Sequence, residues 1–461
     1  MSHPPRPAGD PAPRGASAHR AQRPPDLRLA ALAPLVVLAL GLAAPAPLPA
    51  QSAPATTADE VHRAERERFG FGELRPGASG DPASPNAANA DEAKAGTPAL
   101  PPLFASEAQR EPAAWPQRRA ELARLIEDHW VGRVPEAARD LRVVWRKERV
   151  ASPPGTVAEH WIGQPVAPDG RMGPTIDATI SFPAAPAGVP ALIDYAYVWP
   201  GGRVPDFGGP RPPDPVATAH RHGFAHVAFR PQLLQADSAA TMEQGIIGLV
   251  RWPRERHDWG ALRAWAWGAS RLREELARDP RIDGERIALQ GHSRFGKAVL
   301  VAAAFDHGFA DANVSSSGAG GAKLMRRDFG ETWENLASSG AFHWFTPNAM
   351  RYAAGGRSVA DLPVDAHMLI ALRAPRPLFV TSGTAEKGDS WVDPTGMWLA
   401  VQEAQPAWTL HDAQAPAGPM PPPGNDSQAG FPLGWYQHRE GHIPWPGTGE
   451  FYEHQARFAP D

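Results

Sequence analysis

The stretch Leu289-Gln290-Gly291-His292-Ser293-Arg294-Phe295-Gly296-Lys297 is the most informative part of this chain of 461 residues. A strand-like segment, 286–289, precedes the serine, and an apolar helical segment, 298–304, follows it. A serine at a tight strand-to-helix turn is held where a substrate carbonyl can reach it, and the N–H groups of the helix point at the developing oxyanion. The usual motif is Gly-x-Ser-x-Gly, whereas here the second glycine comes one residue late. The pattern predicts a nucleophilic serine with Arg294 beside it and Lys297 one helical turn beyond; the alternative is an ordinary turn that opens a helix.

Composition excludes several classes of function. The 46 basic and 50 acidic residues nearly balance, so nothing points to a nucleic-acid partner or an anionic surface. The chain has no cysteine, which excludes disulfides, thiolate metal sites and a cysteine nucleophile. Its histidines and carboxylates lack the spacing of a zinc or calcium site, and no nucleotide-binding fingerprint is present. We therefore expect neither a metal nor a cofactor.

The first 50 residues have the pattern of a secretory signal peptide. Basic residues up to Arg28 precede an apolar run, 29–44, and small residues follow, which favours cleavage after Ala50. The apolar run is short for a membrane span, and an uncleaved anchor is the alternative. We therefore expect a secreted or periplasmic protein with no stable membrane span after processing. The oligomeric state cannot be read from the sequence.

The remainder divides into a tether and one catalytic domain. Residues 51–102 are rich in Ala, Pro and Gly, which predicts a disordered tether with no core of its own, and 103–461 is the expected folded domain. Strands alternate with helices in that domain, as in a mostly parallel sheet. Together with the serine turn, this predicts an α/β-hydrolase fold, a three-layer sandwich. The expected helices are 115–130 and 259–278, and the expected further strands are 141–145, 175–182, 191–198, 223–229, 312–316 and 377–383.

A serine hydroxyl needs an imidazole to take its proton and a carboxylate to orient that imidazole. In this fold the partners follow in the order serine, acid, histidine, with the histidine in a loop near the end of the chain. His442 follows Gly441 in such a loop, and His438 is its main rival. His292, beside the serine, is expected to point away from it because neighbours on a turn diverge.

The acid is expected in the loop after the late strand 378–382. That loop supplies Asp389, with Glu386 and Asp393 as competitors. Asp393 precedes Pro394, which is typical of a helix N-cap. The backbone N–H of Arg294 is the expected oxyanion donor, and its side chain can add a charged one.

The motif Gly291-His292-Ser293-Arg294-Phe295-Gly296-Lys297 resembles the signature of the glucuronoyl esterases of carbohydrate esterase family 15, usually written Gly-Cys-Ser-Arg-x-Gly-Lys. His292 stands in place of the cysteine. Further matches follow in order within about 105–458, at 317–321, 330–332, 343–345, 362–367, 374–377, 389–391 and 441–442.

The resemblance implies hydrolysis of esters that join 4-O-methylglucuronic acid of glucuronoxylan to lignin alcohols, through an acyl-enzyme. It implies that Ser293 is the nucleophile, His442 the base and Arg294 the oxyanion donor. Lys297 and Glu331 would hydrogen-bond sugar hydroxyls, and Trp391 would face the sugar ring. The alternatives are a feruloyl or acetyl esterase or a peptidase of the same fold, and a catalytically degenerate carbohydrate-binding protein.

One departure from the family pattern concerns the acid. Many members carry a glutamate immediately before the Ser-Gly-x-Gly-Gly turn, and this chain has Ser316 there. The acid is then expected from the other location, where Asp389 stands.

Overall fold

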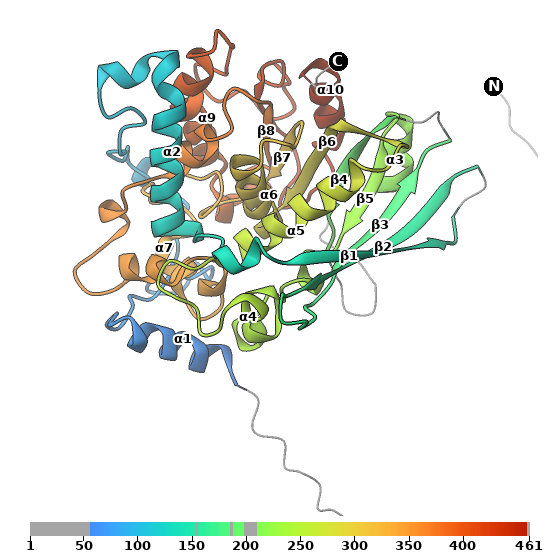
Figure 1. Cartoon of the computed structure of the whole chain (residues 1–461). Helices are drawn as coiled ribbons and strands as arrows, with labels where there is room; N and C mark the ends of the chain where they lie inside the picture. The colour runs from blue at the N-terminus through green and yellow to red at the C-terminus, as the bar shows by residue number, and fades with distance from the viewer. Residues whose placement is uncertain (1–55, 153–154, 185–187, 198–209, 459–461) are drawn as a thin grey trace, which may run out of the picture. The chain divides into compact units, whose positions relative to one another are not determined.

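A nine-stranded sheet forms the centre of this computed structural model, which describes residues 56–152, 155–184, 188–197 and 210–458 (Figure 1). The strand order is β1-β2-β3-β5-β4-β6-β7-β8-β9. The pairs from β1 to β5 along this order are antiparallel, and those from β5 to β9 are parallel. The strands are β1 Arg142–Val150, β2 Val157–Val166, β3 Ile176–Phe182, β4 Val189–Tyr195, β5 Ala225–Phe229, β6 Ile282–His292, β7 Ala312–Ser315, β8 Leu378–Ser382 and β9 Leu433–Gln437.

Helices cover both faces of the parallel strands. On one face α5 packs on α6, α6 packs on β6 and β7, and the layer continues through α8 to α2 and α9 (Figure 1). On the other face, residues of α3 and α10 join strand residues in a second core cluster. The helices are α1 Ala58–Arg68, α2 Trp115–Ile126, α3 Pro215–Arg221, α4 Ile246–Val250, α5 Ala261–Leu276, α6 Arg294–Phe305, α7 Trp333–Ala337, α8 Ala366–Ala371, α9 Pro394–Thr409 and α10 Thr448–Phe458.

This three-layer arrangement confirms the predicted α/β-hydrolase fold. The carboxyl ends of parallel strands meet at one edge of a sheet, so the loops that follow β6, β7, β8 and β9 converge there. Each expected strand and helix has a counterpart in the described residues, although the helix expected over 115–130 is α-helical only to Ile126 and continues as a π-helical turn, Glu127–Val131. Two strands, β2 and β9, were not predicted.

The prediction that residues 51–102 form a disordered tether is wrong for 56–102, the part that the structure describes. Helix α1 begins with a capping box between Thr57 and Glu60. Its Glu65 accepts two hydrogen bonds from the fully buried Arg254, at 2.8 and 2.7 Å. The low apolar content of this segment suggested that it could not bury enough surface to fold, but a buried ion pair holds it to the body instead. Residues 1–50, the predicted signal peptide, lie outside the described residues.

Candidate active site

The turn at Ser293 joins the end of β6 directly to the start of α6. Ser293 has φ 58° and ψ −126°, a strained conformation for a residue with a side chain. Glycines on either side make the turn possible. A Cβ at Gly291 would lie 2.6 Å from the Phe295 carbonyl oxygen, and one at Gly296 would lie 2.7 Å from that of Ser315. The late glycine of the motif therefore serves the close packing of α6 against β7.

The structure brings the predicted acid and base together. Nδ1 of His442 lies 2.6 Å from Oδ1 of Asp389. Oδ2 of Asp389 accepts hydrogen bonds from the Ser316 hydroxyl at 2.8 Å and from the backbone N–H of Gly383 at 2.6 Å. Asp389 is fully buried, which excludes water from these contacts.

His442 and Ser293 face a shared space. Both line a cavity of about 420 Å³, together with Arg294, Tyr197 and Trp445. The His442 side chain is 36% exposed, so its outer edge is accessible from the cavity. The arrangement therefore has the parts of a serine–histidine–carboxylate triad in the predicted chain order.

His292 and His438, the two other histidines considered in the sequence analysis, are buried and neutral. The ring of His292 packs on that of His442 with centroids 4.3 Å apart, and its Nδ1 lies 3.0 Å from the Ser315 hydroxyl. Burial, reinforced by His442, lowers the pKa of His292 well below its ordinary value. Burial also lowers the pKa of His438, the rival base, to about 4. Neither ring has the solvent access of His442.

The competing carboxylates have other positions. Asp393 accepts the N–H of Gly396 at 2.8 Å at the start of α9 and pairs with Arg327, so the prediction of an N-cap is confirmed. Glu386 is exposed on the loop surface.

Arg294 is held by a carboxylate that the sequence analysis missed. Its Nη1 donates to Oδ2 of Asp237 at 2.6 Å, and its guanidinium lies over the Trp344 ring, 5.7 Å from the centroid. Burial disfavours the charge of the guanidinium, but Asp237 outweighs it and raises the pKa of Arg294. Among the described residues, Nε of Arg294 is buried without a hydrogen-bond partner. No motif marks Asp237, although the ordered match at 343–345 includes two of its neighbours.

Lys297, Glu331 and Trp391 also come together. Nζ of Lys297 lies 3.1 Å from Oε2 of Glu331 and donates to the Ser317 carbonyl at 2.6 Å. Burial lowers the pKa of Lys297, and Glu331 partly offsets that effect. The backbone N–H of Glu331 donates to the Trp391 carbonyl at 2.8 Å. These three residues are not among those that line the 420 Å³ cavity, although Nζ of Lys297 lies 5.9 Å from the centroid of the Trp344 ring that Arg294 also contacts.

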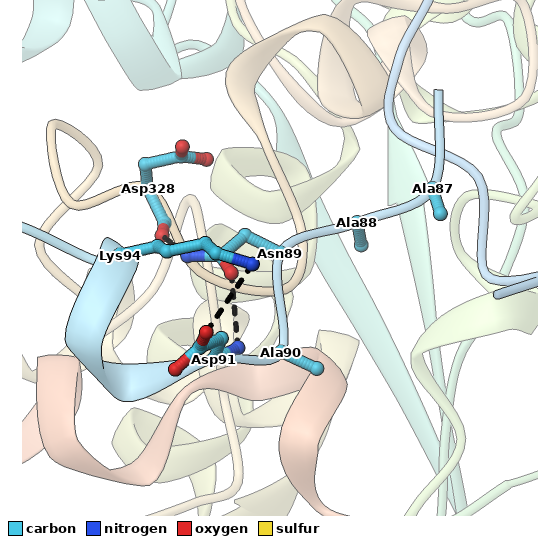
Figure 2. A pocket seen from close by; sticks show the side chains of 7 residues that line it. All are labelled: Ala87, Ala88, Asn89, Ala90, Asp91, Lys94 and Asp328. Atoms are coloured by element: carbon cyan, nitrogen blue, oxygen red, sulfur yellow. Dashed lines mark hydrogen bonds and ion pairs between the residues drawn. The ribbon is translucent and has the colours of Figure 1, made fainter. Parts of the chain in front are cut away.

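A second hollow, of about 490 Å³, lies beside the 3-10 helix Glu92–Lys94. Figure 2 shows Lys94 paired with Asp91 at 3.3 Å, and the N–H of Asp91 bonded to Asn89. Asn89 in turn donates to the Asp328 carbonyl at 2.6 Å. The residues that line this hollow include no serine, threonine or histidine, so it is not a candidate for the serine–histidine–carboxylate site.

Two kinds of feature are absent from the described residues. No helix in those ranges combines the length and apolar character needed to cross a bilayer. No group of three or more His, Asp or Glu side chains in the same ranges is arranged to hold a metal ion.

Comparisons with known proteins agree on one family. The family model described as "Glucuronyl esterase, fungi" matches residues 168–411. A solved structure of a family 15 glucuronoyl esterase from Teredinibacter turnerae T7901 is 37% identical, with a TM-score of 0.79, and the match covers 87% of this chain and 99% of that one.

Curated relatives match over shorter spans. Carbohydrate esterase MZ0003, from an unknown prokaryotic organism, is 42% identical over 156 residues, which is 34% of each chain. The 4-O-methyl-glucuronoyl methylesterase of Hypocrea jecorina is 28% identical over 303 residues, covering 63% of this chain and 57% of that protein. The chain thus spans between about a third and three-fifths of the length of these two relatives. The family model and the full-length structural match nevertheless confirm the resemblance of the motifs: the chain belongs to the glucuronoyl esterases of carbohydrate esterase family 15.

Proposed function

We propose that this protein hydrolyses esters of glucuronic acid and its 4-O-methyl derivative, through an acyl-enzyme on Ser293. The observation that carries the proposal is the 2.6 Å contact between Asp389 and His442, beside a strained serine on the same cavity. The names of the relatives support the substrate class, since they include glucuronoyl esterase and 4-O-methyl-glucuronoyl methylesterase.

The proposed reaction follows from these contacts. Asp389 accepts the Nδ1 proton of His442 and so leaves Nε2 unprotonated. Nε2 takes the proton of the Ser293 hydroxyl as its oxygen attacks the ester carbonyl. The tetrahedral intermediate expels the alcohol, which receives that proton from His442, and water then cleaves the acyl-enzyme by the same steps.

The oxyanion of this intermediate needs donors that are in place before the reaction. In the proposal the backbone N–H of Arg294, at the start of α6, supplies one donor. The guanidinium of the same residue supplies a second, charged donor, since the Arg294 side chain lines the cavity and is 43% exposed.

Sugar recognition is proposed for Lys297, Glu331 and Trp391. The carboxyl of the substrate is esterified and carries no charge, so a Lys–Glu pair serves to bind hydroxyls rather than a carboxylate. The pair is buried and mutually bonded. This fixes the donor Lys297, on α6 one turn from the nucleophile, against the acceptor Glu331, in the loop before α7. Trp391, bonded through its backbone to Glu331, offers its ring to the pyranose face.

Benzyl glucuronate tests the proposal against simple alkyl, acetyl and feruloyl esters, with Ser293→Ala as the inactive control. The expected result is a kcat/KM at least ten times higher on the glucuronate ester. Equal rates on all esters would remove the uronate assignment and favour a broader esterase. Lack of turnover on any ester, with no labelling of Ser293 by a fluorophosphonate, would favour a binding protein on a degenerate fold.

The natural substrate is proposed to be the ester between glucuronoxylan and lignin alcohols, which requires export. Residues 1–50 are proposed as the signal that directs it. Sequencing the amino terminus of the exported protein tests this, and Gln51 is the expected first residue.

A further inference from the structure

Asp237 lies in the loop between two 3-10 helices, Pro231–Leu233 and Ala239–Gln244, near the carboxyl end of β5. The loop is fixed in place by its neighbour Gln235, which is fully buried. The Gln235 carbonyl accepts from Trp265 at 2.7 Å, and its side-chain oxygen accepts from the N–H of Ile247 at 3.1 Å. Asp237 is therefore presented from a rigid loop.

Three donors converge on the Asp237 carboxylate. Oδ2 accepts from Nη1 of Arg294 at 2.6 Å, while Oδ1 accepts from Nε2 of His343 at 3.0 Å and from the indole N–H of Trp344 at 2.6 Å. The Asp237 side chain is 7% exposed. Both oxygens are thus bonded, and the carboxylate has a single orientation in which one oxygen meets the guanidinium.

The same contacts fix the guanidinium. Its Nη1 edge is bonded to Asp237, and its plane lies near the Trp344 ring. Because the guanidinium is planar and rigid, holding Nη1 also sets the direction of its other N–H groups. Nε is buried, whereas the side chain as a whole is 43% exposed and lines the cavity.

We propose that Asp237 is a positioning residue, which aims the guanidinium of Arg294 at the oxyanion and keeps it there through each turnover. The inference rests on the proposed function of Arg294. Asp237 touches neither substrate nor nucleophile in this account, and His343 and Trp344 act by fixing its second oxygen.

The charge of Asp237 and its orientation of Arg294 predict opposite effects of Asp237→Asn on the reaction rate. A negative carboxylate near the site opposes the formation of a negative oxyanion, so a purely electrostatic view expects Asp237→Asn to speed the reaction. The positioning view expects it to slow the reaction. An amide has one oxygen, and it cannot accept from Arg294 and from the His343–Trp344 pair at the same time.

The experiment measures kcat and KM on benzyl glucuronate for Asp237→Asn in the full chain. We expect kcat to fall about 10- to 100-fold, somewhat less than the loss of a whole oxyanion donor, with KM within about twofold. In an Arg294→Ala background, Asp237→Asn should change kcat by less than about twofold, because its effect runs through Arg294. A structural role would lower kcat equally in both backgrounds.

A matched control is Asp306→Asn. Asp306 also pairs with an arginine, Arg273 at 3.2 Å, but lies at the far end of α6, roughly 18 Å along the helix from Arg294. We expect it to leave kcat unchanged. If Asp237→Asn does not fold, Trp344→Phe removes one donor to Oδ1 and keeps an aromatic ring. It should lower kcat several-fold in the native background and leave it unchanged with Arg294→Ala.

The rate of fluorophosphonate labelling separates this inference from the proposed substrate. Labelling forms a bond from the Ser293 oxygen to phosphorus and expels fluoride, with the serine proton passing to His442, so it uses the oxyanion donors without any sugar. A protein that labels but ignores glucuronate esters would refute the proposed function, and Asp237→Asn should still slow its labelling. A rise in kcat, an unchanged kcat, or an equal loss with and without Arg294 would overturn the proposal.

Discussion

Replacing Asp389 with asparagine exchanges one carboxylate oxygen for an NH₂ group and should nearly abolish turnover. The structure sets the orientation of the new amide. The backbone N–H of Gly383, 2.6 Å from Oδ2, is a donor that cannot rotate, so it must keep facing an oxygen. The amide NH₂ is then forced toward Nδ1 of His442, where Oδ1 accepts now.

That orientation selects the wrong form of the imidazole. Facing a donor, Nδ1 must become an acceptor, which moves the ring proton to Nε2 and leaves nothing to accept the proton of Ser293. The loss of kcat expected for such a tautomer switch is about 10⁴-fold, or about 5.5 kcal/mol of activation free energy. Global stability should change much less, because the new side chain has the same size and satisfies the Gly383 N–H.

The assay compares kcat on benzyl glucuronate for the native protein, Asp389→Asn and Ser316→Ala, with unfolding by urea as the check on folding. Ser316→Ala is the matched control, since it removes one donor to the same carboxylate and preserves the carboxylate itself. We expect it to lower kcat less than tenfold. An Asp389→Asn protein that is folded and retains a tenth of native kcat would refute the triad, because the carboxylate would then have no role in setting the tautomer.

Three further predictions concern buried ionisable groups. Glu331→Gln removes the counter-ion of Lys297, so KM on glucuronate esters should rise at least tenfold while kcat/KM on 4-nitrophenyl acetate stays within threefold; equal losses on both esters would refute sugar recognition. The pKa of His438 is about 4 in the folded protein and about 6.5 in an unfolded chain; the folded state then binds fewer protons between these values, and the free energy of unfolding should fall by roughly 3 kcal/mol from pH 6.5 to pH 4. Urea titrations at several pH values should show that the free energy of unfolding depends less steeply on pH in His438→Gln than in the native protein. An unchanged pH dependence would assign the effect to other groups. Glu65→Gln leaves Arg254 buried without its counter-ion and should cost about 3 kcal/mol of stability in urea unfolding. Glu73→Gln, in a pair with Arg66 in which the glutamate side chain is 90% exposed, should cost nothing measurable.

The parts of the site that the sequence predicted are those with a local signature. The turn at Ser293 needs a strand, a small residue and a helix in succession, and all three can be read from adjacent residues. Asp389 and His442 could be placed because chain order in this fold maps onto strand order. Asp389 could be proposed as the acid from the position of its loop after β8, without knowledge of the conformation of that loop.

The parts that were missed depend on contacts between distant segments. Asp237 is separated from Arg294 by more than 50 positions, and its role comes from three side chains that meet only in the folded protein. Helix α1 is held by Glu65 and Arg254, an ion pair that leaves no apolar pattern in the sequence. Strand β9 is short and follows a loop rich in Pro and Gly, so neither its length nor its flanks distinguish it from the loop.

Ser316 and the proposed acid Asp389 come from different segments of the chain but lie side by side in the structure. It follows β7, Asp389 lies beyond β8, and these parallel strands are neighbours whose ends open onto the same edge. The Ser316 hydroxyl lies 2.8 Å from Oδ2 of Asp389, so the position at which the family resemblance implied a glutamate is in direct contact with the proposed acid. Ser316 has φ 41°, and the chain keeps this strained turn although the residue carries no charge. The Ser316 hydroxyl donates to the carboxylate of the proposed acid, whereas a second carboxylate at this position would raise the pKa of Asp389.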